Sequence, residues 1–166
     1  MRAAERARLR LFGPAAGVVA VVSFARAGAP PGQYAPFGQG DVTIKDQKTG
    51  LTWQRSANAQ AADFDDAARY CSALQLGGAT NWRVSSYKEL LTLVDESPHT
   101  EYPTGAPVQI WIDGNAFPET QVNEAYWTSS VSAAGNGAYT VSFSTGAAGF
   151  VPLNTASLYV RCVHEP

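Results

Sequence analysis

The chain has 166 residues, of which 45% are hydrophobic and 16% charged, and this balance is typical of a folded domain with a short appendage rather than of a disordered protein. Five of the twelve basic residues lie before residue 28; from there to the C-terminus seven Lys and Arg stand against thirteen Asp and Glu, a net charge of −6. So acidic a domain repels phosphate backbones, and we expect no nucleic-acid partner.

Residues 1–27 have the layout of a secretory signal peptide. Arginines near the N-terminus precede an apolar stretch from Leu11 to Phe24, and Ala25-Arg26-Ala27 then places small residues before a cleavage point at Gly28. The apolar stretch is shorter than the about 20 residues that cross a bilayer. We therefore expect a secreted, periplasmic or cell-surface bacterial protein with no stable membrane span after cleavage. An uncleaved anchor or an amphipathic membrane helix is the alternative.

The segment that follows, residues 28–40, is rich in Gly and Pro and is interpreted as a linker, which leaves residues 41–166 as the domain. The domain opens on a predicted β-hairpin. Its two runs, Val42–Lys45 and Leu51–Gln54, flank a turn that ends at Gly50.

Two helices are predicted next. Asp63 is a favourable N-cap, and apolar side chains then recur at helical spacing until Gly77-Gly78, on the face formed by Phe64, Ala67, Ala68, Cys71 and Leu74. The second helix begins with a capping box, Ser86 to Glu89, and its apolar face is formed by Tyr87, Leu90, Leu91 and Val94.

Residues 95–125 show no period and are predicted to be an irregular, functional loop region. Four β-like runs follow it: Tyr126–Val131, Tyr139–Phe143, Gly149–Leu153 and Leu158–Val163. A hairpin, two helices, a loop region and a set of strands predict an α+β domain with helices packed on antiparallel sheet.

The only two cysteines, Cys71 and Cys162, are expected to form a disulfide, because cysteines of an exported protein pair. A redox or catalytic pair is the alternative. It needs an exposed thiolate, whereas Cys71 is predicted to lie among apolar neighbours.

Core roles are predicted for Trp53, Trp82 and Trp127, which adjoin expected helices and strands. Arg83 and Glu89 are expected to pair, as are Arg55 and a carboxylate of the first helix. Arg161 is expected to be a partly buried ion-pair donor.

Several short strings run in order through the domain. They are Asp46 followed by Gly50-Leu51-Thr52-Trp53-Gln54-Arg55, Ala68-x-Tyr70-Cys71, Gly77-Gly78 followed by Trp82-Arg83, Tyr87-Lys88-Glu89-Leu90, Phe117-Pro118, Tyr126-Trp127-Thr128-Ser129-Ser130, and Val160-Arg161-Cys162-Val163. Together they resemble the bacterial family of unknown function named after the C-terminal domain of the Legionella collagen-like adhesin. The resemblance runs from about residue 41 to residue 164, nearly the whole mature chain. One departure is visible: the family has Leu-Pro after the Trp-Arg, and this chain has Val84-Ser85.

The resemblance implies a C-type-lectin-like fold, with two helices packed on small antiparallel sheets and a long irregular loop region. In that fold a cysteine of the first helix pairs with one of the last strand. The resemblance also implies a secreted or cell-surface setting and, in some members, adhesion.

Signals for catalysis are weak. The two histidines stand in no metal-ligand spacing and no Gly-x-Ser-x-Gly elbow is present, so we expect no enzyme, no cofactor and no metal. Trp111 is a candidate ligand contact because flat aromatic faces bind sugars and protein hot spots. Asp113, Asn115, Asn123 and Glu124 are further candidate ligand-binding residues, because their side-chain oxygens are of the kind that a hard cation takes as ligands. The alternative for these four residues is ordinary solvated loop polarity.

The sequence thus favours an exported, non-catalytic binding or adhesion module whose partner is an extracellular or envelope glycan or protein. The alternatives are a structural accessory of an envelope assembly and a periplasmic enzyme that uses loop carboxylates. Fold alone does not decide among them.

Overall fold

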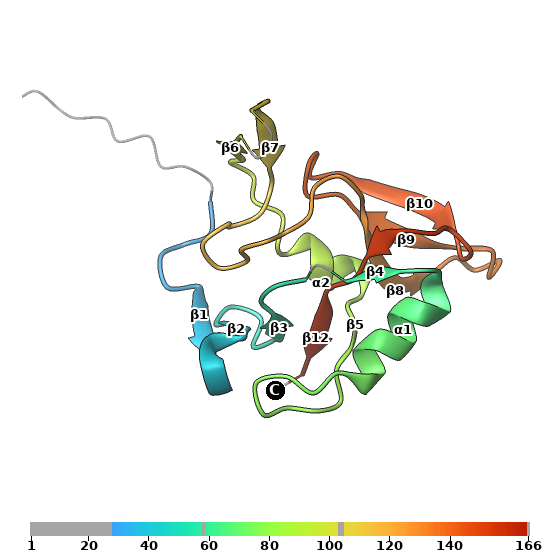
Figure 1. The fold of residues 1–166 in the computed structure, drawn as a ribbon, viewed down its shortest axis with the longest axis horizontal. Coiled ribbons are helices and arrows are strands. Elements are labelled where there is room, and N and C mark those ends of the chain that lie inside the picture. Colours follow the sequence, from blue (N-terminus) through green and yellow to red (C-terminus); the bar gives the residue numbers. More distant parts are fainter. Residues whose placement is uncertain (1–27, 58, 103–104, 166) are drawn as a thin grey trace, which may run out of the picture.

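Two five-stranded sheets, a small hairpin and two α-helices make up the part of the chain that the computed structural model describes, residues 28–57, 59–102 and 105–165 (Figure 1). The α+β class is as expected. The predicted signal peptide, residues 1–27, lies outside the described residues. No helix within the described ranges has the length and apolar character to span a bilayer.

The first sheet is built around the predicted hairpin. β2 (Thr43–Asp46) and β3 (Thr52–Gln54) pair antiparallel with Ile44 opposite Trp53. The sheet order is β1-β2-β3-β12-β5, where β1 is Tyr34–Phe37, β12 is Cys162–His164 and β5 is Arg83–Val84. Alternation places Ile44 and Trp53 on the face that packs into the core. The hairpin prediction is confirmed.

Residues 28–40 are more than a linker. Within them Tyr34–Phe37 form β1, which pairs with β2, and a 3-10 turn follows at Gln39–Asp41. The Gly and Pro content hid this strand, but an edge strand tolerates Pro36 because its missing N–H faces no partner. The ring of Tyr34 meets the ring of Phe117 edge-on at 5.0 Å, which ties the segment to the core.

The second sheet has the order β10-β9-β8-β11-β4, where β11 is Leu158–Tyr159. β8 (Tyr126–Val131), β9 (Gly137–Val141) and β10 (Ala148–Pro152) form an antiparallel meander, as predicted to within two residues. β4 (Gln60–Ala61) closes the other edge.

The last predicted strand, Leu158–Val163, is wrong as a single element. β11 (Leu158–Tyr159) lies in the second sheet, parallel to β8, and β12 (Cys162–His164) lies in the first sheet between β3 and β5. The chain changes sheets at Val160 and Arg161, and a run of β-forming residues carries no sign of such a crossover.

Both helices are confirmed, with small corrections. α1 (Phe64–Ala73) begins where the Asp63 carboxylate accepts a hydrogen bond from the Asp66 N–H at 2.7 Å; Ala67 and Cys71 are buried, whereas Ala68 is exposed. α2 (Tyr87–Leu91) has the predicted capping box and ends before Val94.

The region 95–125 is mostly irregular, as predicted, but it contains a two-stranded hairpin. β6 (His99–Glu101) and β7 (Val108–Ile110) pair antiparallel and project from the body of the fold at the top of Figure 1. The sequence does not predict this hairpin, because strands of three residues that include polar side chains are too short to show an alternation of apolar and polar residues.

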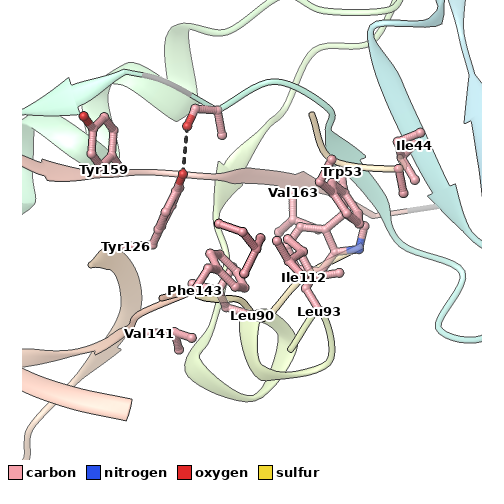
Figure 2. Close-up of a cluster of buried hydrophobic side chains, with 14 residues drawn as sticks. Ile44, Trp53, Leu90, Leu93, Ile112, Tyr126, Val141, Phe143, Tyr159 and Val163 are labelled. Carbon is pink, nitrogen blue, oxygen red and sulfur yellow. Dashed lines mark hydrogen bonds between the residues drawn. The ribbon is translucent and has the colours of Figure 1, made fainter. Parts of the chain in front are cut away.

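The core packs between the sheets and helices. Trp53 and Trp127 have no exposed surface and Trp82 has 2%, so all three core predictions are confirmed. Figure 2 shows Trp53, Leu90, Ile112 and Phe143 gathered in one cluster with Tyr126. The Tyr126 hydroxyl donates to the Ala57 carbonyl at 3.1 Å, which satisfies the one polar atom of that ring in an apolar setting.

Arg161 is fully buried and makes no ion pair with any described carboxylate, so the prediction of a partly buried ion-pair donor is wrong. Its guanidinium donates instead to the carbonyls of Gln54 and Arg55 and to Thr120 Oγ1, each at 2.8 Å. The Phe117 ring lies 4.9 Å away. Burial lowers the pKa of Arg161.

Arg55 likewise bonds to carbonyl oxygens, those of Asp41 and Asn115, and no hydrogen bond or ion pair joins it to the first helix among the described residues.

The disulfide joins Cys71 of α1 to Cys162 of β12, across 91 positions of sequence, and both cysteines are fully buried. The predicted pairing is confirmed. The described residues contain no free cysteine.

Removal of this disulfide should cost roughly 2–5 kcal/mol of unfolding free energy. Without the crosslink the unfolded chain gains conformational entropy, which the long closed loop restricts in the disulfide-bonded protein. The measurement is denaturant unfolding of the oxidised protein against a Cys71→Ala/Cys162→Ala variant. Equal midpoints for the two proteins would show that the pair adds no stability.

The predicted pair of Arg83 and Glu89 is also confirmed, and it makes stability depend on pH. Hydrogen bonds from Arg83, at 2.7 and 2.9 Å, lower the pKa of Glu89 to about 2 from about 4.5. Because the folded pKa is the lower one, the unfolded chain binds more protons between these values, so the stabilisation is complete above about pH 4.5 and is lost as the pH falls to about 2.

Glu89→Gln should remove about 1–2 kcal/mol at neutral pH and flatten the dependence of unfolding free energy on pH in this window, since the pair is partly screened by solvent. Urea unfolding from pH 7 to 2.5 measures it. Glu119→Gln, which removes an exposed carboxylate, should keep the wild-type slope. A Glu89→Gln slope equal to the wild-type one would contradict this account.

Candidate functional site

Three open hollows meet on one side of the molecule. Their volumes are about 320, 200 and 480 Å³, and Ala29 and Asp113 line all three. The walls come from the start of the described chain, from the segment after α2 and from the loop after β7. We call this surface the Asp113 face and define it by Gly28–Ala29, Tyr34, Lys48, Leu91–Ser97, His99, Glu101 and Asp113–Asn115.

Asp113 is held by its own loop. Its Oδ1 accepts the N–H groups of Asn115 at 2.9 Å and Ala116 at 3.1 Å, and its carbonyl accepts the Phe117 N–H at 2.9 Å. The flanking residues Ile112 and Phe117 have no exposed surface. A short capped turn anchored on both sides by core residues therefore fixes this carboxylate at the surface.

The pKa of the Tyr34 hydroxyl responds to the carboxylates of the face. Burial chiefly, and then the carboxylates of Asp46, Asp113 and Asp95, raise the pKa of Tyr34 well above its ordinary value. The ring thus stays a protonated hydrogen-bond donor, and its hydroxyl lies 3.4 Å from the Thr92 carbonyl. A positive group placed here would be attracted by the same carboxylates.

Asp95 is fixed where the chain leaves the second helix region. Its Oδ1 accepts the Ser97 N–H at 2.8 Å, and its own N–H donates to the Trp111 carbonyl at 2.9 Å. The Trp111 N–H in turn donates to the Phe143 carbonyl at 2.8 Å. Backbone bonds therefore tie Asp95 to Trp111 and, through it, to the meander of the second sheet.

The third hollow is walled by the β6–β7 hairpin. His99 Nε2 lies 3.0 Å from Glu101 Oε1, and both side chains reach over Gly114, where an added Cβ would come within 3.1 Å of the histidine nitrogen. The described residues hold no group of three or more His, Cys, Asp and Glu side chains arranged for a metal ion.

Residues 42–164 match the family model of the Lcl C-terminal domain. The chain belongs to this family. The match runs from β2 to β12, so it includes Asp95 and Asp113 and leaves out β1 and the first wall of the face. No curated protein and no solved structure matches the chain.

The five predicted contact residues of this Lcl C-terminal domain are not all together. Asp113 and Asn115 lie on the Asp113 face, but Asn123 and Glu124 are exposed elsewhere and line none of its hollows. Tyr34, Lys48 and Asp95 line the face and were not predicted. Tyr34 lay in the segment interpreted as a linker; Lys48 and Asp95 carry no local motif. Whether any of these side chains binds a ligand stays a prediction.

Trp111 of the Lcl C-terminal domain is half-buried and is not among the residues that line the three hollows. Its ring lies over the β9–β10 turn: a Cβ added to Gly146 would meet Trp111 Cε3 at 2.8 Å, and Gly146 has a φ of +67°. The absence of a side chain at Gly146 leaves room for the indole.

Gly146→Ala should therefore lower the unfolding free energy by about 1–2 kcal/mol for the positive φ, and should also displace the indole and shift the tryptophan emission. Gly135→Ala is the matched control, because Gly135 has a φ of +69° and nothing within 4 Å of the added Cβ. It should lose similar stability with unchanged emission. The same emission from both variants would show that Gly146 does not seat the ring.

Proposed function

We propose that this Lcl C-terminal domain is an exported, non-catalytic binding module of the adhesion kind, and that it binds an extracellular or envelope glycan or protein at the Asp113 face. The observation that carries the proposal is the meeting of three open hollows at Asp113 and Ala29. Concave surfaces with a few fixed polar groups are where proteins bind ligands.

Export is supported by three features. These are the signal-peptide layout of residues 1–27, the Cys71–Cys162 disulfide and the family, whose name is that of an adhesin-type domain. The disulfide from the first helix to the last strand also supports the finer proposal of a C-type-lectin-like fold, with the irregular region 95–125 as its ligand-binding part.

The charge of the face suggests the ligand chemistry. Asp95, Glu96 and Asp113 line the first hollow together with Lys48, and Tyr34 adds a hydroxyl donor. Carboxylates at a surface accept hydrogen bonds from hydroxyl-rich sugars and attract basic side chains. We therefore propose a hydroxyl-rich or basic ligand.

A second candidate function, a structural accessory of an envelope assembly, is favoured by a different surface. Tyr139 and Phe150 of the meander are 42% and 48% exposed, and their rings meet at 5.5 Å; Tyr87 of α2 continues the row at 5.3 Å from Tyr139. Exposed aromatic rows of this kind are used in protein contacts.

Asp113→Asn should weaken ligand binding at least about tenfold, equivalent to about 1.4 kcal/mol, because it removes the charge and keeps the oxygen that accepts the two backbone N–H groups. Ligands are first sought with the disulfide-bonded protein on arrays of glycans and of extracellular and envelope proteins. Affinities of the variants are then measured by calorimetry.

Asp65→Asn, an exposed change on α1, is the charge-matched control and should bind as the wild type does. Retained binding by Asp113→Asn together with loss in Phe150→Ala would move the site to the aromatic row and favour the accessory role. A protein with no ligand on any array would overturn the binding proposal.

A further inference from the structure

The start of the described chain lies against a carboxylate of the Asp113 face. A Cβ built on Gly28 would lie 3.2 Å from Asp95 Oδ2 and 3.6 Å from Oδ1. The Gly28 nitrogen is bonded to the same Cα, about 2.5 Å from that Cβ position, so at most about 6 Å separates it from the carboxylate oxygen. Gly28 is also the residue that the signal-peptide layout places first after cleavage.

We propose that removal of residues 1–27 creates an α-ammonium group at Gly28 that forms an ion pair with Asp95, so that the mature N-terminus becomes a functional wall of the Asp113 face. This inference rests on the proposed export. In the precursor the same nitrogen is an uncharged amide, and hydrolysis of the Ala27–Gly28 peptide bond by water yields the Ala27 carboxylate and the Gly28 ammonium. The ion pair therefore exists only in the processed protein.

The surroundings favour a positive charge at this place. The charged and titratable groups that line the two hollows next to Gly28 are the acids Asp95, Glu96, Glu101 and Asp113, the bases Lys48 and His99, and the Tyr34 phenol, which stays protonated and neutral. The acids come from the segment after α2, from β6 and from the loop after β7. Asp95 itself is preset to receive the ammonium, because its Oδ1 is held by the Ser97 N–H.

Two properties of the chain make the contact sterically accessible. A glycine adds no side chain between its nitrogen and Asp95, and the Gly28 and Ala29 positions line the same two hollows as Asp95. A charged terminus at this place neutralises one acid of the face and adds three N–H donors to its rim. Processing thus changes the donor and charge pattern offered to a ligand.

The experiment uses the full chain exported from a bacterial host. Intact mass of the purified protein should give a terminus at Gly28; a terminus at any other residue overturns the proposal. The α-amino pKa is then measured from the pH titration of the Gly28 Cα resonance in protein labelled with ¹³C-glycine. It should lie about half a unit or more above the usual ~7.7–8.0, because a carboxylate within ~6 Å favours the charged form.

Asp95→Asn should return this pKa to the usual range while keeping the oxygen that accepts the Ser97 N–H. Glu96→Gln, which removes a neighbouring exposed acid, should leave most of the elevation in place. A mature protein produced with one extra Ala before Gly28 should show the usual α-amino pKa, because its ammonium stands one residue away.

An unshifted pKa in the mature wild type, or a shift that survives Asp95→Asn, overturns the ion pair. Neither result touches the ligand arrays and the Asp113→Asn affinities, so failure of this inference is distinguishable from failure of the proposed binding function. Conversely, a shifted pKa in a protein that binds nothing on the arrays would uphold the ion pair alone.

Discussion

Arg161 lies where the last segment of the chain leaves one sheet and enters the other. A buried guanidinium costs several kcal/mol of desolvation unless its N–H groups are bonded. Here it donates to two carbonyls at the end of β3 and to Thr120 in the loop before β8, against the Phe117 ring. The next residue, Cys162, is bonded to α1. Two adjacent residues thus join both sheets, the first helix and the loop region 115–120. This explains why the last strand of the chain connects the parts of the domain.

This junction also sets the position of the Asp113 face. The Phe117 ring contacts both the Arg161 guanidinium and the Tyr34 ring, and the Phe117 N–H donates to the Asp113 carbonyl. The capped turn that carries Asp113 is therefore held by the same aromatic ring that meets the buried cation. A loop supported in this way is a rigid platform, and polar groups on a loop above a rigid scaffold are the usual arrangement for recognition.

The elements that the sequence predicts well are those with local causes. The Asp63 cap and the Ser86–Glu89 box each satisfy backbone donors within one turn, and the β2–β3 hairpin follows from alternation around Gly50. The features that the sequence does not predict depend on contacts between distant segments. β1 forms because it can pair with the edge of β2. The crossover at Arg161 leaves no mark in a run of β-forming residues. Arg161 is buried because its N–H groups bond to carbonyl oxygens instead of to acids. The face was half predicted: Asp113 and Asn115 belong to a polar turn, whereas Tyr34 and Asp95 reach it only through the fold.

The distribution of charge underlies the proposed role in binding. Glu89 is paired with Arg83, and Asp46 accepts the Lys48 N–H and the Thr49 hydroxyl. Asp95 and Asp113 likewise accept backbone N–H groups of their own turns. On the Asp113 face four acids line two adjoining hollows that hold one lysine and one histidine. Like charges brought together cost folding free energy, and fixed turns at Asp95 and Asp113 hold them there. Both proposals, a hydrogen-bond-donating or basic ligand and a charged mature terminus, rest on this excess of acids.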